Sequence, residues 1–365
     1  MCNFLLKISD MKNIIIFFGG VGSPTQFGGE LSKNKEIISR LKELNCDLVV
    51  IDSFKSRENI LKLMRIVIKF FFNLIIHPKA IVIFSTSFGN TYALLKILKY
   101  WPNKHRIINW VIGGVLSDRI ANGEFSHKYV KVIDLFIVEG EKMKHKMAEA
   151  GFNNVIYKPN FKAVGVLPKI QKANDGKIHF LFISRILPDK GCRYILQSAE
   201  KLNQYGLNGK FIVDFYGNID DDYRFEFENA ISNMSNVNYC GSLQLQDERN
   251  YAKLAQYHYM LFPTYWHGEG FPGVVIDAYK AGVPIIGSDW NLNLEFIKNG
   301  VTGIVTPSHS VEKLTEAMQN AIDGKYDNMA MSNICQRQVM LYDTRNVINT
   351  ELLDVIFNCE TQKKS

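Results

Sequence analysis

The sequence lacks the features that mark secreted, metal-binding and membrane-spanning chains. Its six cysteines are scattered over 365 residues without a C-x-x-C pair or a histidine–cysteine cluster. This pattern disfavours a metal site and indicates a reduced, cytoplasmic chain. No stretch approaches the roughly 20 apolar residues that a membrane span needs, and the run Ile14–Phe18 is too short for a signal-peptide core. Basic and aromatic residues do not alternate as in nucleic-acid-binding modules, so nucleic acid is not an expected partner.

What the sequence does contain is an ordinary globular composition with an uneven charge. Apolar residues make up 47% and charged residues 22%, and the length exceeds the usual size of one core, so we expect two domains. Residues 1–172 carry 26 Lys and Arg against 13 Asp and Glu, and the remainder carries 17 against 23. The basic first half predicts an anionic partner; its charge alone would suit nucleic acid, and a membrane surface or a diphosphate-bearing acceptor fits equally well. The residues from Met11 onward are typical of a natural start, so we expect residues 1–10 to be either a loose extension or the product of an upstream start codon.

The first half alternates apolar strands with helical stretches. Ile14–Phe18 ends in two glycines, and a glycine-rich loop leads to a helix predicted over Glu30–Leu44. Such loops are typical of phosphate binding. This one lacks a clean G-x-G-x-x-G, and Asp52 is weakly placed for a ribose, so a dinucleotide site is disfavoured. The repeated alternation predicts a parallel, doubly wound sheet with ligands at the carboxyl ends of its strands.

One long helix, predicted over Ser56–Ile76, is both basic and apolar. Lys62, Arg65 and Lys69 share one face, and the same helix carries a large apolar surface. A helix of this kind lies either on an anionic membrane surface or on the outside of a Rossmann-like domain, with a solvated basic edge. The sequence leaves both interpretations open.

A segment of mixed polarity, Lys162–Lys177, is typical of a hinge between domains. The alternation restarts after it with a strand predicted over Ile178–Ser184. The acidic triplet Asp220–Asp222 follows a glycine in a loop, and we predict a polar turn there rather than a metal site. A final helix is predicted from Tyr342 to Phe357.

The most informative stretch combines a loop, a helix and a strand. Glu269 lies among glycines in the loop, where backbone can approach a ligand closely. Pro272 suits the first position of a helix predicted over Gly273–Ala281, and Asp277 lies eight positions beyond Glu269. The free amides of such a helix start attract phosphate, and a flanking carboxylate can accept bonds from sugar hydroxyls. The combination predicts binding of a phosphorylated sugar compound.

This stretch resembles the donor signature of retaining glycosyltransferases of family 4, in which one Glu is followed by a second after seven residues. Here Glu269 matches the first position, Asp277 replaces the second Glu, and Pro272 stands at a usual Gly position. The segment Ser184–Gly191 is similar to the G-R-L-x-x-x-K-G element of the same family, with Ser in place of the first Gly. The resemblance extends from about Ile14 to Phe357.

The resemblance implies a fold and a division of the chain. It implies the GT-B fold, an α/β architecture of two Rossmann-like, doubly wound domains facing a cleft, with a C-terminal helix crossing back to the first domain. We expect an acceptor-binding domain over residues 1–172, a donor-binding domain over 173–340 and the crossing helix over 341–365.

The resemblance also implies an activity: retaining, metal-independent transfer of a sugar from a UDP- or GDP-sugar, without a cofactor. Glu269 would hold sugar hydroxyls, and Arg185 and Lys190 would stabilise the leaving diphosphate. Asp277 would meet the ribose or base, and Glu295 a sugar or ribose hydroxyl. The remaining donor-binding residues implied are Gly28, Gly29, Gly270, Phe271, Pro272 and Gly273.

The acceptor side is less defined by the sequence. Asp118 is either an acceptor residue or the N-cap of a helix, and Gly28 and Gly29 either approach the ligands or form a turn with positive φ. By resemblance the acceptor is a saccharide, typically lipid-linked, in bacterial capsule, O-antigen or other surface polysaccharide synthesis. This implies a cytoplasmic protein; on the membrane interpretation of the helix at Ser56–Ile76, that helix would be its contact with the inner face of the membrane.

Three rival functions share these features. A nucleotide-sugar epimerase of the same architecture would not transfer to an added acceptor, and a phosphorylase would require inorganic phosphate. A non-catalytic nucleotide-sugar or polyanion binder would bind donor without turnover.

Overall fold

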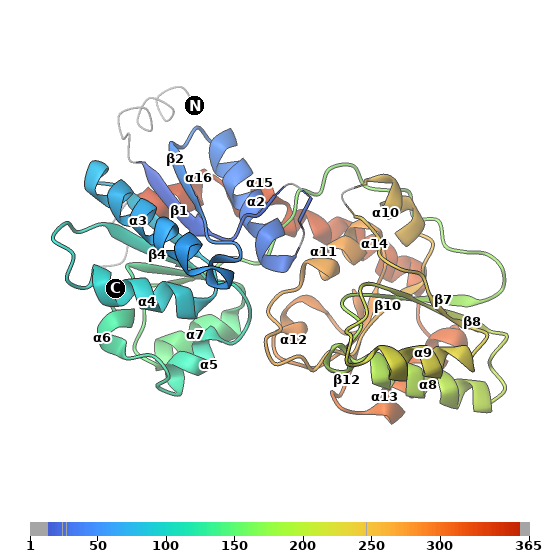
Figure 1. Ribbon diagram of the computed structural model, residues 1–365. Coiled ribbons are helices and arrows are strands. Elements are labelled where there is room, and N and C mark those ends of the chain that lie inside the picture. Colours follow the sequence, from blue (N-terminus) through green and yellow to red (C-terminus); the bar gives the residue numbers. More distant parts are fainter. Residues whose placement is uncertain (1–13, 24, 27, 246, 358–365) are drawn as a thin grey trace, which may run out of the picture. The chain divides into compact units, whose positions relative to one another are not determined.

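A computed structural model describes residues 14–23, 25, 26, 28–245 and 247–357 of the chain. It divides into two compact units (Figure 1). The first unit ends at Ala163 and resumes at Asp343, and the second runs from Val164 to Tyr342. The sequence predicted the boundary between the units after residue 172, but it falls earlier, between Ala163 and Val164. Lys172 explains the difference, because its Nζ donates to the carbonyl oxygens of Tyr257 and Gly282 and holds the segment on the second unit. The extension at residues 1–10 lies outside the described residues.

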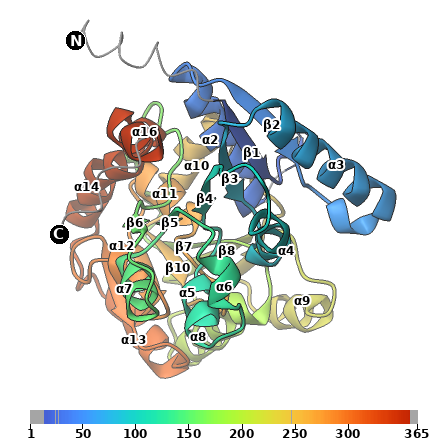
Figure 2. The same cartoon turned by 90° about the vertical axis from the view of Figure 1, so that its left-hand side faces the viewer.

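The first unit is built on a six-stranded sheet with the order β2-β1-β3-β4-β5-β6 and parallel pairing throughout. Its strands are β1 (Ile15–Gly19), β2 (Leu48–Asp52), β3 (Ile81–Ser85), β4 (Arg106–Trp110), β5 (Leu135–Val138) and β6 (Val155–Tyr157). Its helices are α2 (Gly29–Glu43), η1 (Ser56–Glu58), α3 (Ile60–Ile76), α4 (Phe88–Leu98), α5 (Leu116–Ala121), α6 (His127–Val130), α7 (Glu141–Glu149), α15 (Thr344–Val347) and α16 (Thr350–Phe357). Figure 2 shows α3 on the outer side of this unit, near the edge strand β2.

Both faces of the first sheet are buried, as a parallel sheet requires. Side chains alternate between the faces, so Phe17 packs with α2, α15 and α16, whereas Phe18 points to the other side. There the Phe18 ring meets that of Phe70 on α3, with 5.5 Å between centroids. The core on the α2 side includes Val347, Leu352 and Ile356 from the end of the described chain. These late residues are therefore part of the first unit's interior.

The second unit repeats the plan with the strand order β12-β11-β10-β7-β8-β9, again parallel. Its strands are β7 (Ile178–Ile183), β8 (Phe211–Tyr216), β9 (Val237–Tyr239), β10 (Tyr259–Phe262), β11 (Ile285–Ser288) and β12 (Gly303–Thr306). Its helices are η2 (Pro188–Lys190), α8 (Cys192–Gln204), α9 (Arg224–Ser232), α10 (Arg249–Leu254), α11 (Gly273–Lys280), α12 (Asn293–Phe296), α13 (Val311–Ile322), α14 (Asn328–Gln338) and η3 (Val339–Tyr342). In Figure 1, α8, α9 and α13 lie on one side of the sheet and α10, α11 and α14 on the other.

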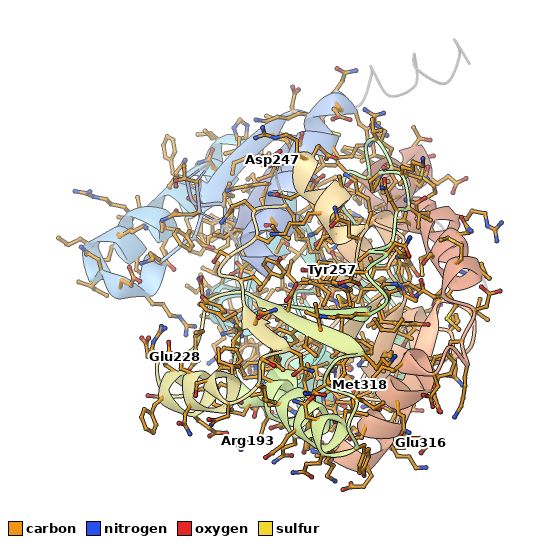
Figure 3. The ribbon with its side chains drawn as sticks, turned by 90° about the vertical axis from the view of Figure 1, so that its right-hand side faces the viewer. Arg193, Glu228, Asp247, Tyr257, Glu316 and Met318 are labelled. Carbon is orange, nitrogen blue, oxygen red and sulfur yellow. The ribbon has the colours of Figure 1, made fainter. Side chains whose placement is uncertain are left out.

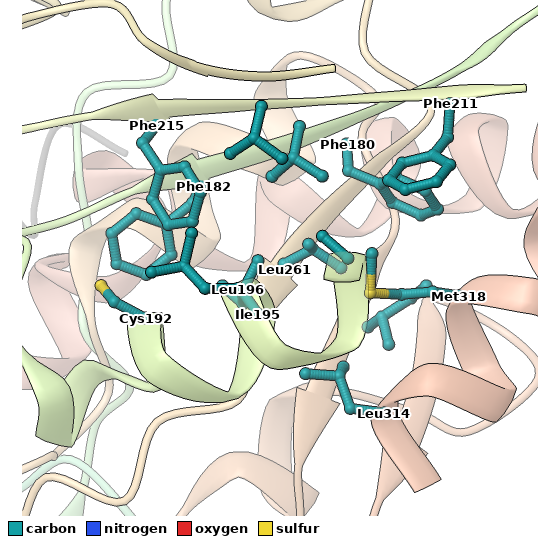
Figure 4. Close-up of a cluster of buried hydrophobic side chains, with 14 of the residues drawn as sticks. Phe180, Phe182, Cys192, Ile195, Leu196, Phe211, Phe215, Leu261, Leu314 and Met318 are labelled. Carbon is teal, nitrogen blue, oxygen red and sulfur yellow. The ribbon is translucent and has the colours of Figure 1, made fainter. Parts of the chain in front are cut away.

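The core of the second unit lies between its sheet and α8, α9 and α13. Figure 4 shows aromatic side chains of β7 and β8, such as Phe182 and Phe215, against apolar residues of α8 and α13. Helix α13 illustrates the sidedness: Met318 is buried and Glu316, two residues earlier, is exposed (Figure 3). The predicted pair of doubly wound parallel sheets is confirmed.

Two predicted helices differ from those observed. The helix predicted from Ser56 to Ile76 is divided, because the Asn59 side chain accepts the N–H groups of Leu61 and Lys62 and begins a new helix there. The single final helix predicted from Tyr342 is also wrong. Asp343 caps α15 and Asn349 accepts the N–H of Leu352, so the segment forms two short helices after η3.

Candidate functional site

The second unit has a topological switch point between β7 and β10. These strands are neighbours in the sheet, yet the chain runs from β7 to β8 on one side and from β10 to β11 on the other. In open parallel sheets, ligands bind beyond the carboxyl ends of strands at such a point. The segments beyond those ends are Ser184–Gly191, after β7, and Pro263–Pro272, after β10. They are the two stretches that carry the family resemblance.

Lys190 and Glu269 meet at this point. Lys190 Nζ lies 2.6 Å from Glu269 Oε2, and both residues are buried. The Thr264 hydroxyl donates to the same carboxylate oxygen over 2.9 Å. Such charge-assisted bonds fix both side chains. Two of the three predicted catalytic residues are thus in direct contact.

The third, Arg185, stands at the rim of the same site. Its guanidinium carbon lies 5.3 Å from the centre of a Trp266 ring, and Lys190 Nζ lies 5.8 Å from a Trp266 ring centre. Both cations therefore lie within reach of a cation–π interaction with one indole. The Arg185 side chain is otherwise exposed. Sequence reasoning missed Trp266, although an aromatic residue next to a glycine-rich loop could have indicated it.

The close approach of the two loops depends on Gly191. Its φ is +87°, and a Cβ there would lie 2.3 Å from the carbonyl oxygen of Pro263. Only glycine adopts this backbone without strain and also leaves room for the other loop. The glycine after Lys190 therefore sets the position of the lysine beside Glu269.

The predicted helix start after the loop is present, with one correction. Pro272 is the N-cap of α11 rather than its first residue, with φ −75° and ψ 136°. The helix amides begin at Gly273, directly after the loop. Phe271 is buried, and its ring stacks on that of Phe296 with centroids 4.5 Å apart. Gly270 is buried as well, so these residues shape the loop as much as they border the site.

Asp277 belongs to a separate polar cluster. It is 1% exposed, on α11, and the Tyr251 hydroxyl donates to its Oδ1 over 2.6 Å. Lys280 Nζ lies 3.9 Å from the Tyr251 ring centre and 2.7 Å from Glu248 Oε2. The contacts therefore place Asp277 with α10, while Glu269 contacts the loop after β7. Tyr251 was not predicted from the sequence.

The loop after β11 closes onto the Glu269 loop. The Asn291 side chain donates to the main-chain oxygen of Glu269, and Trp290 Nε1 donates to that of Trp266 over 2.9 Å. Asn291 has φ +50°, a left-handed conformation that Asn adopts more readily than most other non-glycine residues. Glu295 follows on α12 and is half-buried. The predicted Glu295 is therefore on the segment that contacts the site, and Trp290 and Asn291 were missed.

In the first unit, Gly28 and Gly29 border a pocket of about 400 Å³. Gly28 has an extended backbone with φ 161°, Gly29 is the first residue of α2, and an added Cβ at either would meet nothing within 4 Å. The alternative of a turn with positive φ is therefore wrong for Gly28. The pocket is also lined by Glu30, Lys55 and Arg57. Burial raises the pKa of the Glu30 carboxyl, although the Gly20 N–H that it accepts opposes this shift.

Asp52 is engaged by its own loop. Its carboxylate accepts the N–H groups of Val21, Gly22 and Phe54 over 2.8, 3.1 and 2.9 Å. These bonds hold the glycine-rich segment after β1 in place. This arrangement explains an aspartate at the end of β2 without a bound ribose.

Asp118 lies inside the first turn of α5, which begins after Val115, so the N-cap alternative is wrong. Its carboxylate forms an ion pair with Lys146 on α7, and it is half-buried. The structure thus gives Asp118 a partner within its own unit, and Asp118 is not among the residues that line the glycine pocket.

The described residues contain neither a metal cluster nor a membrane span. Among them, no group of three or more His, Cys, Asp and Glu side chains is placed to hold a metal ion. The acidic triplet forms a turn, in which Asp220 accepts the N–H of Asp222 and Asp221 pairs with Arg224. In the same described part of the chain, no helix has the length and apolarity to cross a bilayer.

Solved structures with the same arrangement define the class of fold. The structure of the lipopolysaccharide outer core galactosyltransferase WaaB aligns with a TM-score of 0.69 at 15% identity, over 94% of this chain and 99% of that one. HepE from Anabaena, solved with UDP, aligns with a TM-score of 0.66 at 14% identity, over 94% and 99%. The chain has the GT-B fold.

The family comparison is more specific. Residues 166–337, which make up most of the second unit, match the family model of glycosyl transferases group 1. The capsular polysaccharide biosynthesis glycosyltransferase CapM of Staphylococcus aureus is 22% identical over 47% of this chain and 46% of its own length. An Escherichia coli UDP-Gal:alpha-D-GlcNAc-diphosphoundecaprenol alpha-1,3-galactosyltransferase is 20% identical over 58% and 53%. The matched part spans about half the length of these relatives.

Proposed function

We propose that the protein transfers a sugar from a nucleotide diphosphate sugar to a saccharide acceptor. The observation that carries this proposal is the Lys190–Glu269 pair, flanked by Arg185, at the switch point of a glycosyl transferases group 1 domain. The pair combines a carboxylate for sugar hydroxyls with cations for a diphosphate.

In the proposed reaction, the diphosphate of the donor takes the place of Glu269 as the partner of Lys190. Arg185 adds a planar fork suited to phosphate oxygens, and the amides at Gly273 supply further donors. Negative charge grows on the diphosphate as the bond to the sugar breaks, and fixed cations lower the energy of that state. Glu269, released from Lys190, accepts bonds from the sugar hydroxyls.

The finer features of the reaction are part of the same proposal. We assign the protein to family 4, with retention of configuration and no requirement for a metal ion or other cofactor. The donor is a UDP- or GDP-sugar, and UDP is favoured because HepE, which shares the fold, was solved in complex with UDP. Asp277 serves the ribose or base of the donor, and Glu295 a hydroxyl of the sugar or the ribose.

The acceptor in this proposal is a lipid-linked saccharide of bacterial surface-polysaccharide synthesis. The names of two relatives support it, one assigned to capsular polysaccharide and one to a diphosphoundecaprenol-linked sugar. The acceptor would enter at the first unit, by Gly28 and Gly29, with Asp118 on its acceptor side. The reaction would then take place in the cytoplasm, at the inner face of the membrane.

A thermal-shift panel is the first test. UDP, GDP, their common sugars and NAD(P)H are compared, with magnesium and with EDTA. We expect one nucleotide and its sugars to raise the melting temperature equally in both conditions. Stabilisation by NAD(P)H alone, or only with magnesium, would contradict the proposal.

Transfer itself is then measured with that donor and membrane-extracted acceptor. Lys190→Gln and Glu269→Gln should each lower turnover by at least about a hundredfold. Lys201→Gln and Glu312→Gln alter an exposed ion pair of the same unit and should leave turnover unchanged. NMR of the product should show the anomeric configuration of the donor. Epimerised donor without transfer, or a requirement for inorganic phosphate, would favour an epimerase or a phosphorylase.

A further inference from the structure

The outward side of α3 is apolar and uncovered. Seven large hydrophobic side chains of this helix are between 48% and 67% exposed: Ile60, Leu61, Met64, Ile68, Phe72, Ile75 and Ile76. At 3.6 residues per turn they fall on one continuous face. The opposite side already supplies the core, through Ile66, Phe70 and Leu74. The exposed face is therefore not needed for packing within the unit, and soluble monomers rarely keep such a face without a partner.

A row of cations follows one edge of this apolar face. Lys62, Arg65 and Lys69 lie at successive turns and are exposed, and α3 contains no acidic residue. Lys62 Nζ donates to the Phe54 carbonyl oxygen over 2.6 Å, and Lys69 Nζ to that of Val50 over 3.3 Å. These bonds hold the ammonium groups of Lys62 and Lys69 beside the helix rather than extended into solution. The helix thus presents an apolar face and a positively charged edge side by side.

The positive edge continues into the glycine pocket. Lys55 and Arg57 line that pocket and immediately precede α3 in the chain. Both side chains are exposed. Lys55 Nζ pairs with Glu58 Oε1 over 3.1 Å, so it is Arg57 that extends the basic edge of α3 to the rim of this cavity, which is large enough for a phosphate group with part of its substituent.

We infer that α3 docks the protein on an anionic lipid bilayer, with its apolar face among the upper acyl chains and Lys62, Arg65 and Lys69 at the lipid phosphates. Helices with this division of apolar and basic residues lie in the interfacial layer of a membrane. The alternative occupant is a second copy of the chain. A twofold contact through α3 would bring the two basic rows near each other without an acidic residue on either helix to compensate. Charge complementarity therefore favours anionic lipid.

This inference is independent of turnover, because binding to lipid requires no sugar donor. It adds to the proposed function a reason for the pocket's position: docking by α3 holds the pocket rim at the depth of lipid head groups. A failure of transfer with intact vesicle binding would contradict the proposed reaction alone. A failure of vesicle binding with intact nucleotide binding would contradict docking alone.

The test is co-sedimentation of the full chain with vesicles of phosphatidylcholine, with and without phosphatidylglycerol. We expect binding to the mixed vesicles that weakens as salt is raised. The triple variant Lys62→Ser, Arg65→Ser and Lys69→Ser should partition about a hundredfold less, since each cation near an anionic surface contributes a several-fold factor. The control is the triple variant Lys104→Ser, Lys131→Ser and Lys142→Ser, which has the same change in net charge at exposed positions elsewhere in the unit. Its binding to the mixed vesicles should fall much less.

The apolar face is tested separately with Leu61→Ser, Met64→Ser, Ile68→Ser and Phe72→Ser combined. This variant should lose binding to the mixed vesicles, whereas Ile97→Ser and Phe225→Ser, at exposed apolar positions on other helices, should not. All substituted side chains are exposed, so an unchanged melting temperature verifies folding. Undiminished binding of the α3 apolar variant would overturn the inference. So would light scattering that finds a lipid-free dimer which this variant disperses.

Discussion

Lys190 and Glu269 lie 79 positions apart in the chain and 2.6 Å apart in the structure, between Nζ and Oε2. Their side chains are 10% and 6% exposed, so removing either leaves the other charge buried without this partner. We expect Lys190→Met and Glu269→Gln each to lower the free energy of unfolding by roughly 3–5 kcal/mol, and the double variant to lower it by clearly less than their sum. Urea denaturation of the four proteins measures this.

The exposed pair Lys201–Glu312 has nearly the same separation, 2.7 Å. A double-mutant cycle with Lys201→Met and Glu312→Gln, measured in the same way, should give a coupling energy below about 1 kcal/mol, because solvent screens the charges. Equal coupling in the two cycles would refute the idea that burial strengthens the Lys190–Glu269 pair.

Gly191→Ala should lower the free energy of unfolding by about 3 kcal/mol or more. The substitution adds a Cβ at φ +87°, 2.3 Å from the carbonyl oxygen of Pro263, so both backbone strain and a clash result. Gly206 has φ +78° but open space around it, and Gly206→Ala should cost only about 1 kcal/mol. Thermal unfolding of both variants separates the clash from the strain. We also expect Gly191→Ala to weaken nucleotide binding, since Lys190 precedes it.

Stability should decrease in mild acid because of His258. Burial, together with the nearby Lys172 charge, lowers the pKa of His258 to about 4, and its Nδ1 accepts the His179 N–H over 3.1 Å. Between about pH 4 and 6.5 the unfolded chain binds a proton at this histidine that the folded chain does not. The free energy of unfolding therefore falls as the pH falls through this window, by roughly 1–3 kcal/mol.

His258→Asn, whose side-chain oxygen can accept the same N–H, should remove that part of the pH dependence. His145→Asn, at an exposed position on α7, serves as the control. Parallel stability curves for the parent protein and His258→Asn across this window would disprove this assignment.

Tyr251→Phe should destabilise the second unit by about 1.5–3 kcal/mol, because buried Asp277 loses a hydroxyl donor 2.6 Å away. Tyr239→Phe removes a hydroxyl that donates to the Gly217 carbonyl oxygen at an exposed position, and should cost less than about 1 kcal/mol. Chemical denaturation of both variants makes the comparison. A smaller loss for Tyr251→Phe than for Tyr239→Phe would argue against a tightly held Asp277.

Features that arise from residues close together in the chain could be predicted from the sequence, whereas contacts between distant residues could not. The parallel strands are continuous apolar runs between turns, which is a local pattern, and their existence was predictable. Lys190 and Glu269 could be singled out through a motif, but their direct contact depends on β7 and β10 being neighbours, which composition does not encode. Trp266 and Asn291 escaped prediction because their roles come from loop conformations, including the φ of +50° at Asn291.

Element ends were mispredicted where a side chain caps a helix. Asn59 and Asp343 each accept a backbone N–H at a helix start, and each divides an apolar pattern that looks continuous in the sequence. For Asp277, the sequence indicated the position but not the contacts. Its spacing from Glu269 was visible, but burial and the bond from Tyr251 depend on α10 packing beside α11.

The return of the chain to its first unit has a consequence for synthesis. Residues 164–342 form an uninterrupted unit, whereas the first unit's core needs Val347, Leu352 and Ile356. A ribosome delivers these side chains after the whole second unit, so the second unit can complete its core while the first still exposes part of its sheet. A nascent chain stalled before residue 343 should therefore hold a protease-resistant second unit and a first unit that remains open to chaperones.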